Sequence, residues 1–307
     1  MPKLALKIDV DTLRGTLEGV PPLVSMLQKH QAQATFLFSL GPDNTGRALR
    51  RVFRPGFLKK MFRTNVAANY GLKTLMYGVL IPGPDIGRKG AAAMRAVRDA
   101  GYEVGIHTWD HVRWQDYVVG KDAAWTRQEF VQAVERFRGV FGAEPKTFGA
   151  AGWQMNFHAF ELEHEFHMQY ASDTRGTHPF LPEMRGRVFA VPQIPTTLPT
   201  LDELVGVDGI TVDNVAEHLL KLTAGLAPEH GHVYTLHAEL EGMALSPVFD
   251  KLLSGWRGQG YELVATETIA AGLDRKKLPM HTVVMGEIAG RSGTLALQGT
   301  ACEARTV

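Results

Sequence analysis

The feature that most constrains the fold of this chain is an alternation of short apolar runs with helical patterns. Runs rich in β-favouring residues and bounded by Gly, Pro, Asn or Asp predict strands, at residues 4–8, 33–40, 102–107, 146–149, 168–172, 188–191, 232–236 and 261–264. Apolar side chains at helical spacing predict helices, at residues 19–27, 89–100, 126–142, 156–166, 212–222 and 246–256. Such strand–helix repeats favour an α/β fold with parallel strands, in a barrel or in a doubly wound sheet.

One of these helices carries recognisable signals at both ends. Thr126 and Glu129 stand in the capping-box pattern, in which each side chain bonds to the backbone amide of the other residue. The pattern predicts that this helix begins at Thr126, and Gly142 is expected to close it.

The alternation is interrupted in two places. Residues 41–90 are too long for a simple loop, so we expect an insertion there. Residues 276–307 contain Gly and Thr but no helical stripe, and they predict a loose C-terminal tail that is ordered only in part. The expected organisation is one domain over residues 1–275, which includes the insertion, followed by the tail at residues 276–307.

The insertion is strongly basic along part of its length. Between residues 47 and 73 the chain has no acidic residue and eight basic ones, Arg47, Arg50, Arg51, Arg54, Lys59, Lys60, Arg63 and Lys73. Aromatic and aliphatic residues are interleaved with them. This composition is typical of a helical segment that lies on a membrane surface, where each basic side chain contributes about 1 kcal/mol through anionic headgroups. A solvated basic helix pair packed on the main domain is the alternative.

Composition excludes several other classes of protein. Lys and Arg number 33 against 32 for Asp and Glu, so no overall basic excess indicates a nucleic-acid partner. The single cysteine, Cys302, rules out an intrachain disulfide and a cysteine-based zinc cluster. The start of the chain lacks the apolar core of a signal peptide, and the most apolar stretch, residues 74–81, is far shorter than the ~20 residues that span a bilayer. We therefore expect a cytoplasmic location.

Polar side chains cluster at the predicted carboxyl ends of strands, which share one face in a parallel barrel. Asp9 and Asp11 alternate along an extended segment, so both carboxylates are expected on one side. His107 and His111 place two imidazoles at the end of another strand, where a carboxylate would complete a site for Zn²⁺ or a similar ion. His237 follows a third strand. A base, a metal and an acid are what a metal-assisted hydrolase needs. Surface aspartates and structural histidines are the alternative interpretation.

These residues resemble the motifs of a known family. Asp9-x-Asp11, His107-Thr-x-x-His111 and Leu236-His237 are similar, in order and spacing, to the first, second and fifth motifs of the polysaccharide deacetylases, also called the NodB-homology or carbohydrate esterase 4 family. The resemblance implies a distorted (β/α) barrel and metal-dependent hydrolysis of an N-acyl sugar. It implies that Asp9 is the base, that His237 is the acid, and that Asp11, His107 and His111 bind the metal. Zn²⁺ is the first choice of metal, with Mn²⁺, Co²⁺ or Ni²⁺ as alternatives.

The third motif departs from the family pattern. Its usual Arg, which orients the base, is absent from residues 148–153, where only the aromatic residue Trp153 is kept. Arg175, two residues after Asp173, is the candidate replacement, and a surface Arg in a turn is the alternative. Asp110 and Asp173 are expected either to fix an imidazole tautomer or to serve as turn and cap residues. Trp153 is expected to line the sugar site or to belong to the core.

Within the family, the whole sequence is most similar to a branch that acts on a lipid-linked sugar. Three segments carry this resemblance, residues 8–12, 39–44 and 235–239. It implies removal of a formyl group from an aminoarabinose carried on undecaprenyl phosphate, in the lipid A modification that bears on polymyxin resistance. It also implies a peripheral protein at the cytoplasmic face of the bacterial inner membrane. N-deacetylation of another sugar or polysaccharide is the alternative. A glycosyltransferase that uses Asp9-x-Asp11, or a membrane-binding scaffold, would leave the histidines without a role.

Overall fold

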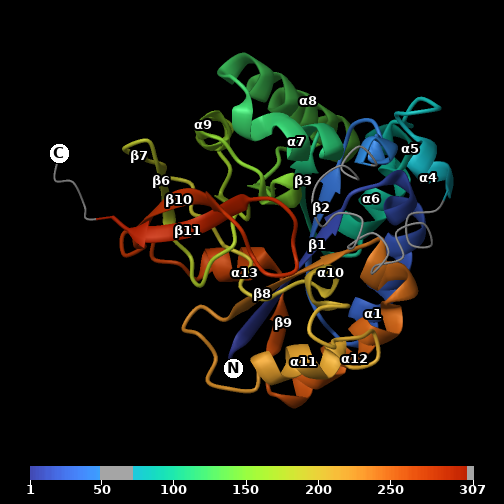
Figure 1. Ribbon diagram of the computed structural model, residues 1–307, viewed down its shortest axis with the longest axis vertical. Helices are drawn as coiled ribbons and strands as arrows, with labels where there is room; N and C mark the ends of the chain where they lie inside the picture. The colour runs from blue at the N-terminus through green and yellow to red at the C-terminus, as the bar shows by residue number, and fades with distance from the viewer. Residues whose placement is uncertain (49–71, 303–307) are drawn as a thin grey trace.

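A computed structural model describes residues 1–48 and 72–302 of the chain (Figure 1). Its centre is a seven-stranded sheet in the order β5-β4-β3-β2-β1-β8, with β9 pairing with the start of β1. The strands are β1 (Lys3–Val10), β2 (Thr35–Ser39), β3 (Glu103–Thr108), β4 (Thr147–Phe148), β5 (Tyr170–Ala171), β8 (His232–His237) and β9 (Glu262–Val264). Every pairing in this sheet is parallel, and the sheet curls into a half-barrel. The expected α/β fold with a distorted barrel is confirmed.

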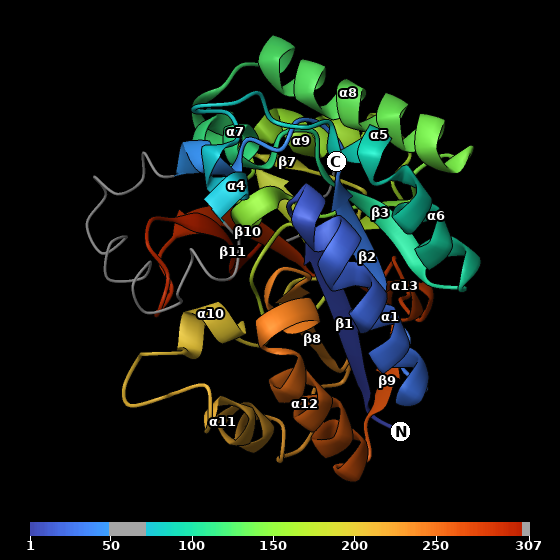
Figure 2. The same cartoon turned by 90° about the vertical axis from the view of Figure 1, so that its right-hand side faces the viewer.

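Helices cover the outside of the curled sheet (Figure 2). The longer ones are α1 (Val20–Lys29), α6 (Ala91–Asp99), α8 (Ala123–Phe141), α9 (Phe157–Glu165), α11 (Val215–Leu222) and α12 (Ser246–Gly258). Shorter ones are α4 (Leu72–Met76), α5 (Ile86–Lys89), α7 (His111–Tyr117), α10 (Leu201–Leu204) and α13 (Thr266–Ala271). Single turns of other helix types are η1 (Gly15–Gly19), η3 (Val118–Gly120), η4 (Ala151–Trp153) and η5 (Leu240–Ala244). In the described residues, no helix is both long and apolar enough to span a membrane.

Strand β1 is buried on both faces, and its side chains point alternately to one face of the sheet and to the other. Leu4, Leu6, Ile8 and Val10 belong to the large apolar core beneath the helices. Ala5 belongs to a second, smaller apolar cluster with residues of β5, β8 and β9. Because successive side chains of a strand point to opposite faces, Lys7 and Asp9 lie on the same face as Ala5, inside the half-barrel. The strand thus carries apolar residues to the helices and polar residues to the interior.

An irregular segment, residues 192–198, connects the two edges of the half-barrel. Its backbone bonds to β5 through Ala171, whose amide donates to Pro192 at 2.9 Å and whose carbonyl accepts from Ile194 at 2.8 Å. On the other side the amide of Thr197 donates to the carbonyl of Val233 in β8 at 3.0 Å. These bonds satisfy edge groups that an open sheet would leave exposed. The interior of the half-barrel is consequently enclosed without an eighth strand in that place.

The expectation of a loose tail at residues 276–307 is wrong for most of that segment. Strands β10 (Met280–Gly286) and β11 (Leu295–Ala301) pair antiparallel and join β6 (Leu181–Met184) and β7 (Arg187–Val188) in a second, four-stranded sheet (Figure 1). Hydrogen bonds attach β11 to the main domain at Arg175, whose amide donates to Ala296 at 2.9 Å. The burial of Val283, Leu295 and Ala296 is the reason that this segment folds. The strand expected at residues 188–191 also falls here, only in part and outside the parallel sheet.

Helix α8 begins earlier than the capping-box pattern predicts. Asp122 is the N-cap, and its carboxylate accepts a hydrogen bond from the amide of Trp125 at 2.9 Å. Thr126 lies inside the first turn, where its hydroxyl donates to the carbonyl of Asp122 at 2.8 Å. The prediction of a helix start at Thr126 is therefore wrong, because a better cap lies four residues upstream. The expected end is confirmed, since Gly142 closes the helix with φ at 65°.

The basic part of the insertion lies mostly outside the described residues. Arg50, Arg51, Arg54, Lys59, Lys60 and Arg63 belong to that part. The described remainder includes α4, α5 and the loop between them, which exposes several large apolar side chains. Asn44, at the start of the insertion, donates a hydrogen bond of 2.6 Å from its side chain to Asp110 beside α7.

Candidate metal centre and active site

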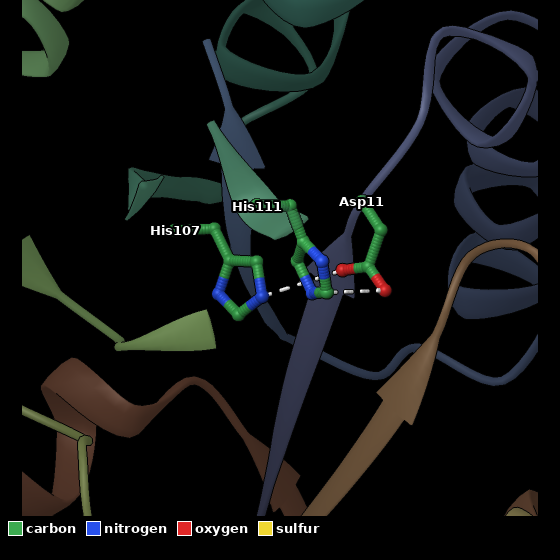
Figure 3. A group of neighbouring side chains, drawn as sticks. All are labelled: Asp11, His107 and His111. Atoms are coloured by element: carbon green, nitrogen blue, oxygen red, sulfur yellow. Dashed lines mark ion pairs between the residues drawn. The ribbon is translucent and has the colours of Figure 1, made fainter. Parts of the chain in front are cut away.

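Asp11, His107 and His111 meet at the carboxyl ends of β1 and β3 (Figure 3). Asp11 follows β1, His107 lies in β3, and His111 is the first residue of α7. The Nε2 atom of His107 lies 3.3 Å from Oδ1 of Asp11, and Nε2 of His111 lies 3.4 Å from Oδ2. Asp11 and His107 are buried, whereas the His111 side chain is 18% exposed. The structure therefore brings together the three residues that the sequence indicated as metal ligands.

A backbone carbonyl orients the imidazole of His107. The Nδ1 atom lies 2.7 Å from the carbonyl oxygen of Gly149, at the end of β4. Since a carbonyl only accepts hydrogen bonds, Nδ1 carries the proton, and the lone pair of Nε2 faces Asp11. This is the arrangement in which histidine binds a metal ion.

Asp110 positions the other histidine through the start of α7. It is the N-cap of that helix, and its carboxylate accepts from the amide of Arg113 at 3.0 Å. It also accepts the side-chain bond from Asn44 at 2.6 Å. Of the two roles expected for Asp110, these bonds correspond to the cap. The cap fixes where α7 begins, and so where His111 lies.

The electrostatics of this site favour a carboxylate beside cations. Burial raises the pKa of Asp11, but protonated His111, His107 and His237 would outweigh burial and hold that pKa well below its usual range. In the described residues, Oδ1 of Asp11 and Oδ1 of Asp9 are both buried without a hydrogen-bond donor. Two imidazole lone pairs and a carboxylate that converge in this way need protons or a metal ion between them. Two neutral histidines with one aspartate are a donor set that fits a divalent transition metal.

Asp9 and His237 lie next to each other in the sheet, since they are register partners in the pairing of β1 with β8. Asp9 is 2% exposed, and its Oδ1 lies 3.8 Å from Nδ1 of His107. Burial lowers the pKa of His237, but the charges of Asp11, Asp202, Asp9 and Glu241 outweigh it and raise that pKa above its ordinary value. A protonated His237 beside the site is consistent with an acid.

Arg175 does not bond to Asp9. Its Nη1 atom donates to both carboxylate oxygens of Glu203, at 2.7 and 2.8 Å, and Nη2 donates to the carbonyl of Leu198. Its guanidinium also lies over the ring of Trp153, 5.1 Å from the centroid. The hypothesis that Arg175 replaces the missing third-motif Arg is therefore wrong, because the guanidinium of Arg175 binds both carboxylate oxygens of Glu203 instead.

Trp153 and Asp173 are both buried behind the centre. Trp153 is 2% exposed and packs between cationic side chains, among them Arg291 from the loop after β10, at 4.5 Å from the ring centroid. Asp173 accepts a hydrogen bond from the amide of Ala150 at 2.7 Å and another from the Gln193 side chain at 2.9 Å. Its bonds thus support the backbone that follows β4, which is the segment that orients His107.

Sequence reasoning missed two residues at the site. Lys7 lies inside the half-barrel with Nζ 3.4 Å from Oδ2 of Asp9, although a lysine within an apolar strand carries no motif signal. Glu239 holds the loop that contains Asp11, since its Oε1 accepts bonds from the amides of Asp11 and Thr12 at 3.1 and 2.9 Å. Burial, and then the charge of Asp11, raise the pKa of Glu239 to about 8. The one sequence signal that could have indicated Glu239 is its position, two residues after His237.

The fold and the site together define a class: α/β proteins that carry a candidate metal centre at the carboxyl ends of parallel strands. Here two histidines and one aspartate form that centre. The sequence model of the polysaccharide deacetylases matches residues 4–171, which contain all three candidate ligands. This chain belongs to the polysaccharide deacetylase family, and it is a hydrolase of that family.

Relatives and solved structures agree with this assignment. A 4-deoxy-4-formamido-L-arabinose-phosphoundecaprenol deformylase of Shewanella sediminis is 38% identical over 300 residues, which cover 97% of this chain and 95% of the relative. A protein of the same description from Wigglesworthia glossinidia brevipalpis is 30% identical over 291 residues, which cover 92% and 98%. A polysaccharide deacetylase structure from Mycobacterium smegmatis shares the fold, with a TM-score of 0.63, 17% identity, and coverage of 93% of this chain and 94% of that one.

Proposed function

We propose that this protein removes the formyl group from 4-deoxy-4-formamido-L-arabinose carried on undecaprenyl phosphate. The reaction would serve the aminoarabinose modification of lipid A and hence polymyxin resistance. The observation that carries the proposal is the 38% identity to a deformylase of that description over 97% of this chain. The reaction is hydrolysis of an amide: water adds to the formyl carbon, the C–N bond breaks, and formate and a free 4-amino sugar leave.

Asp11, His107 and His111 would hold a divalent metal ion, Zn²⁺ first and Mn²⁺, Co²⁺ or Ni²⁺ as alternatives. When bound, such an ion polarises a carbonyl and makes water more acidic. The orphaned Oδ1 of Asp11 and the Nε2 atom of His107, which both face the centre, support this assignment. The Gly149 carbonyl would keep His107 in the tautomer that binds the ion.

Asp9 is the proposed base and His237 the proposed acid. Oδ1 of Asp9 is buried and accepts no hydrogen bond from the described residues, so it can take a proton from the attacking water. His237 lies beside Asp9 in the sheet, and the surrounding carboxylates favour its protonated form. It would give its proton to the sugar nitrogen as the C–N bond breaks. The two residues thus divide proton transfer between the entering and the leaving group.

A membrane surface is the proposed partner, because the lipid chain of the substrate stays in the bilayer. The basic segment of residues 47–73 supports this proposal by composition. The described loop after it supports the proposal by exposure, since Val79 is 52% and Leu80 is 75% exposed. Exposed aliphatic side chains beside basic ones are typical of a protein that lies on anionic lipid. The corresponding location is peripheral, at the cytoplasmic face of the inner membrane.

The decisive experiment measures formate release from the lipid-linked formamido sugar. We expect release by the purified protein, its loss after treatment with a metal chelator, and its recovery on addition of Zn²⁺. Asp11→Asn should lose both bound metal and activity, whereas Asp99→Asn, an exposed carboxylate in α6, should keep both. Release of acetate from the N-acetyl sugar but no formate from the formamido sugar would replace the proposal with a deacetylase. Full activity in the metal-free protein would overturn the assigned centre.

A further inference from the structure

Lys7 is a cation enclosed by the half-barrel. Its residue exposure is 0%, and it is among the largest fully buried side chains in the described residues. A buried ammonium is strongly destabilising unless charged or polar groups surround it. Its Nζ donates to the carbonyl of Ser172 at 3.0 Å and lies 3.4 Å from Oδ2 of Asp9, and its charge also opposes the rise in pKa that burial causes at Asp173. The ring of Trp153 lies beneath it, with the centroid 5.2 Å from Nζ.

The two carboxylate oxygens of Asp9 have different neighbours. Oδ2 lies 3.4 Å from the ammonium of Lys7, whereas Oδ1 lies 3.8 Å from Nδ1 of His107 and accepts no hydrogen bond from the described residues. The fixed positions of Ser172 and Trp153 hold the ammonium from two other sides. A carboxylate with one oxygen held by a rigid cation has a defined orientation, so its second oxygen points in one direction only.

The third-motif segment makes room for this lysine. A Cβ atom on Gly149 would lie 3.2 Å from Cε and 3.4 Å from Nζ of Lys7, and only 2.3 Å from Cδ1 of Leu37. A side chain at that position would therefore compete with Lys7 for space. The segment where the family pattern has an arginine is small in this chain, and a cation from β1 fills the interior beside it. Arg175 is bonded to Glu203 and does not take that place.

We propose that Lys7 is the positioning residue for Asp9, which it holds by one carboxylate oxygen so that the other faces the reacting water. This inference rests on the proposed function in one respect, the assignment of Asp9 as the base. The cation comes from the strand that also carries Asp9, two residues earlier, so the sheet itself sets the geometry of the pair.

Kinetics of Lys7→Met and Lys7→Arg test the proposal. Met keeps the apolar stem of Lys but lacks the terminal ammonium, so we expect kcat to fall by ~100-fold, as misplaced catalytic groups do, with KM changed by less than ~3-fold. Lys7→Arg keeps a cation, and we expect at least ~10-fold more activity from it than from the Met variant. Bound metal should stay stoichiometric in both, because Lys7 contacts none of the three ligands. Lys3→Met, the same change at the start of β1, is the matched control and should be neutral.

A stability cycle tests the pair without any turnover. Lys7→Met leaves the charge of Asp9 buried without its partner, so the Tm should fall, and adding Asp9→Asn should recover much of that loss. Wild-type kcat in Lys7→Met, or Tm losses that simply add, would overturn the inference. If the wild-type protein released no formate, the proposed function would fail, yet the stability cycle would still report whether Lys7 and Asp9 are coupled.

Discussion

Lys7 and Glu103 are both ionisable residues enclosed by the sheet, yet their surroundings differ. Lys7 faces the carboxylate of Asp9. Glu103, at the start of β3, has neutral donors and the carboxylate of Glu267 near it: its Oε2 accepts from the Tyr170 hydroxyl at 2.7 Å and also from the Thr35 hydroxyl. Burial is the largest influence on its pKa, which rises to about 7 despite these hydrogen bonds. A buried carboxyl with hydroxyl partners is more stable when it keeps its proton.

Glu103 should therefore make the stability of the protein depend on pH. Its pKa is about 7 in the folded state against an ordinary value of 4.5, so the folded state binds the extra proton between those limits. Its contribution is complete below pH 4.5 and is lost as the pH rises through about 7. Glu103→Gln cannot titrate, so we expect its stability relative to wild type to rise by up to ~3 kcal/mol from about pH 4.5 to about pH 8.

Urea unfolding of both proteins across this range would measure the difference, in which the titrations of groups distant from Glu103 cancel. Glu262→Gln, an exposed carboxylate in β9, is the matched control and should show little change with pH. A difference between Glu103→Gln and wild type that stayed constant with pH would contradict the raised pKa.

At the residue scale, the sequence predicts side chains that follow motifs and misses groups that do not. Asp11, His107 and His111 were indicated by spacing at strand ends, and the structure brings them together. The carbonyl of Gly149 has no side-chain signature, since any residue has one. Lys7 was missed because a single lysine in an apolar strand carries no motif signal, and its contacts with Ser172 and Trp153 join segments that the sequence does not show to be close. Such partners depend on curvature, which arises only when the whole sheet forms.

At the element scale, helix α8 shows that existence is easier to predict than boundaries. Apolar periodicity indicated this helix correctly, and Gly142 ends it as expected. Its start was misplaced because two capping patterns overlap, and the choice depends on how the chain enters the helix from η3. Strands β10 and β11 were missed because each holds only a short apolar run, within a segment whose Gly and Thr residues indicated a loose tail. They form because the second sheet packs on the main domain at Arg175, a tertiary contact that local sequence does not contain.

Gly139, inside α8, and Gly142, directly after its end, provide a test in which the same substitution has opposite effects. Gly139 lies in the exposed face of the helix, and an added Cβ would meet no atom within 4 Å, so Gly139→Ala should stabilise by about 0.5–1 kcal/mol. Gly142 has φ at 65°, where an L side chain is strained, so Gly142→Ala should destabilise by about 1 kcal/mol although it too has open space. Chemical denaturation measures both. The same sign for the two variants would contradict the observed helix end.

At the scale of the whole molecule, the site and the described parts of the insertion, residues 41–48 and 72–90, lie at one end of the barrel. The insertion follows β2 at its carboxyl end, where the candidate ligands also gather, and the bond from Asn44 to Asp110 joins the two regions. The loop before β8 lies at the opposite, amino end of the strands, and its Leu226 is fully exposed. A sugar held at a bilayer surface can reach the site only if the carboxyl end of the barrel faces the lipid.

This polarity predicts which surface would make the proposed membrane contact. Val79→Asp with Leu80→Asp places charge on the exposed loop of the insertion, and we expect it to abolish co-sedimentation with anionic vesicles. Leu226→Asp changes an equally exposed aliphatic residue at the other end, and it should bind vesicles as wild type does. Binding should also weaken as salt rises, because headgroup attraction is screened. Formate release from a soluble analogue without the lipid chain should stay unchanged in the double variant, since the site is intact. Equal loss of vesicle binding in the Leu226 variant would contradict the proposed orientation, because a surface that faces away from the bilayer cannot contribute to binding it.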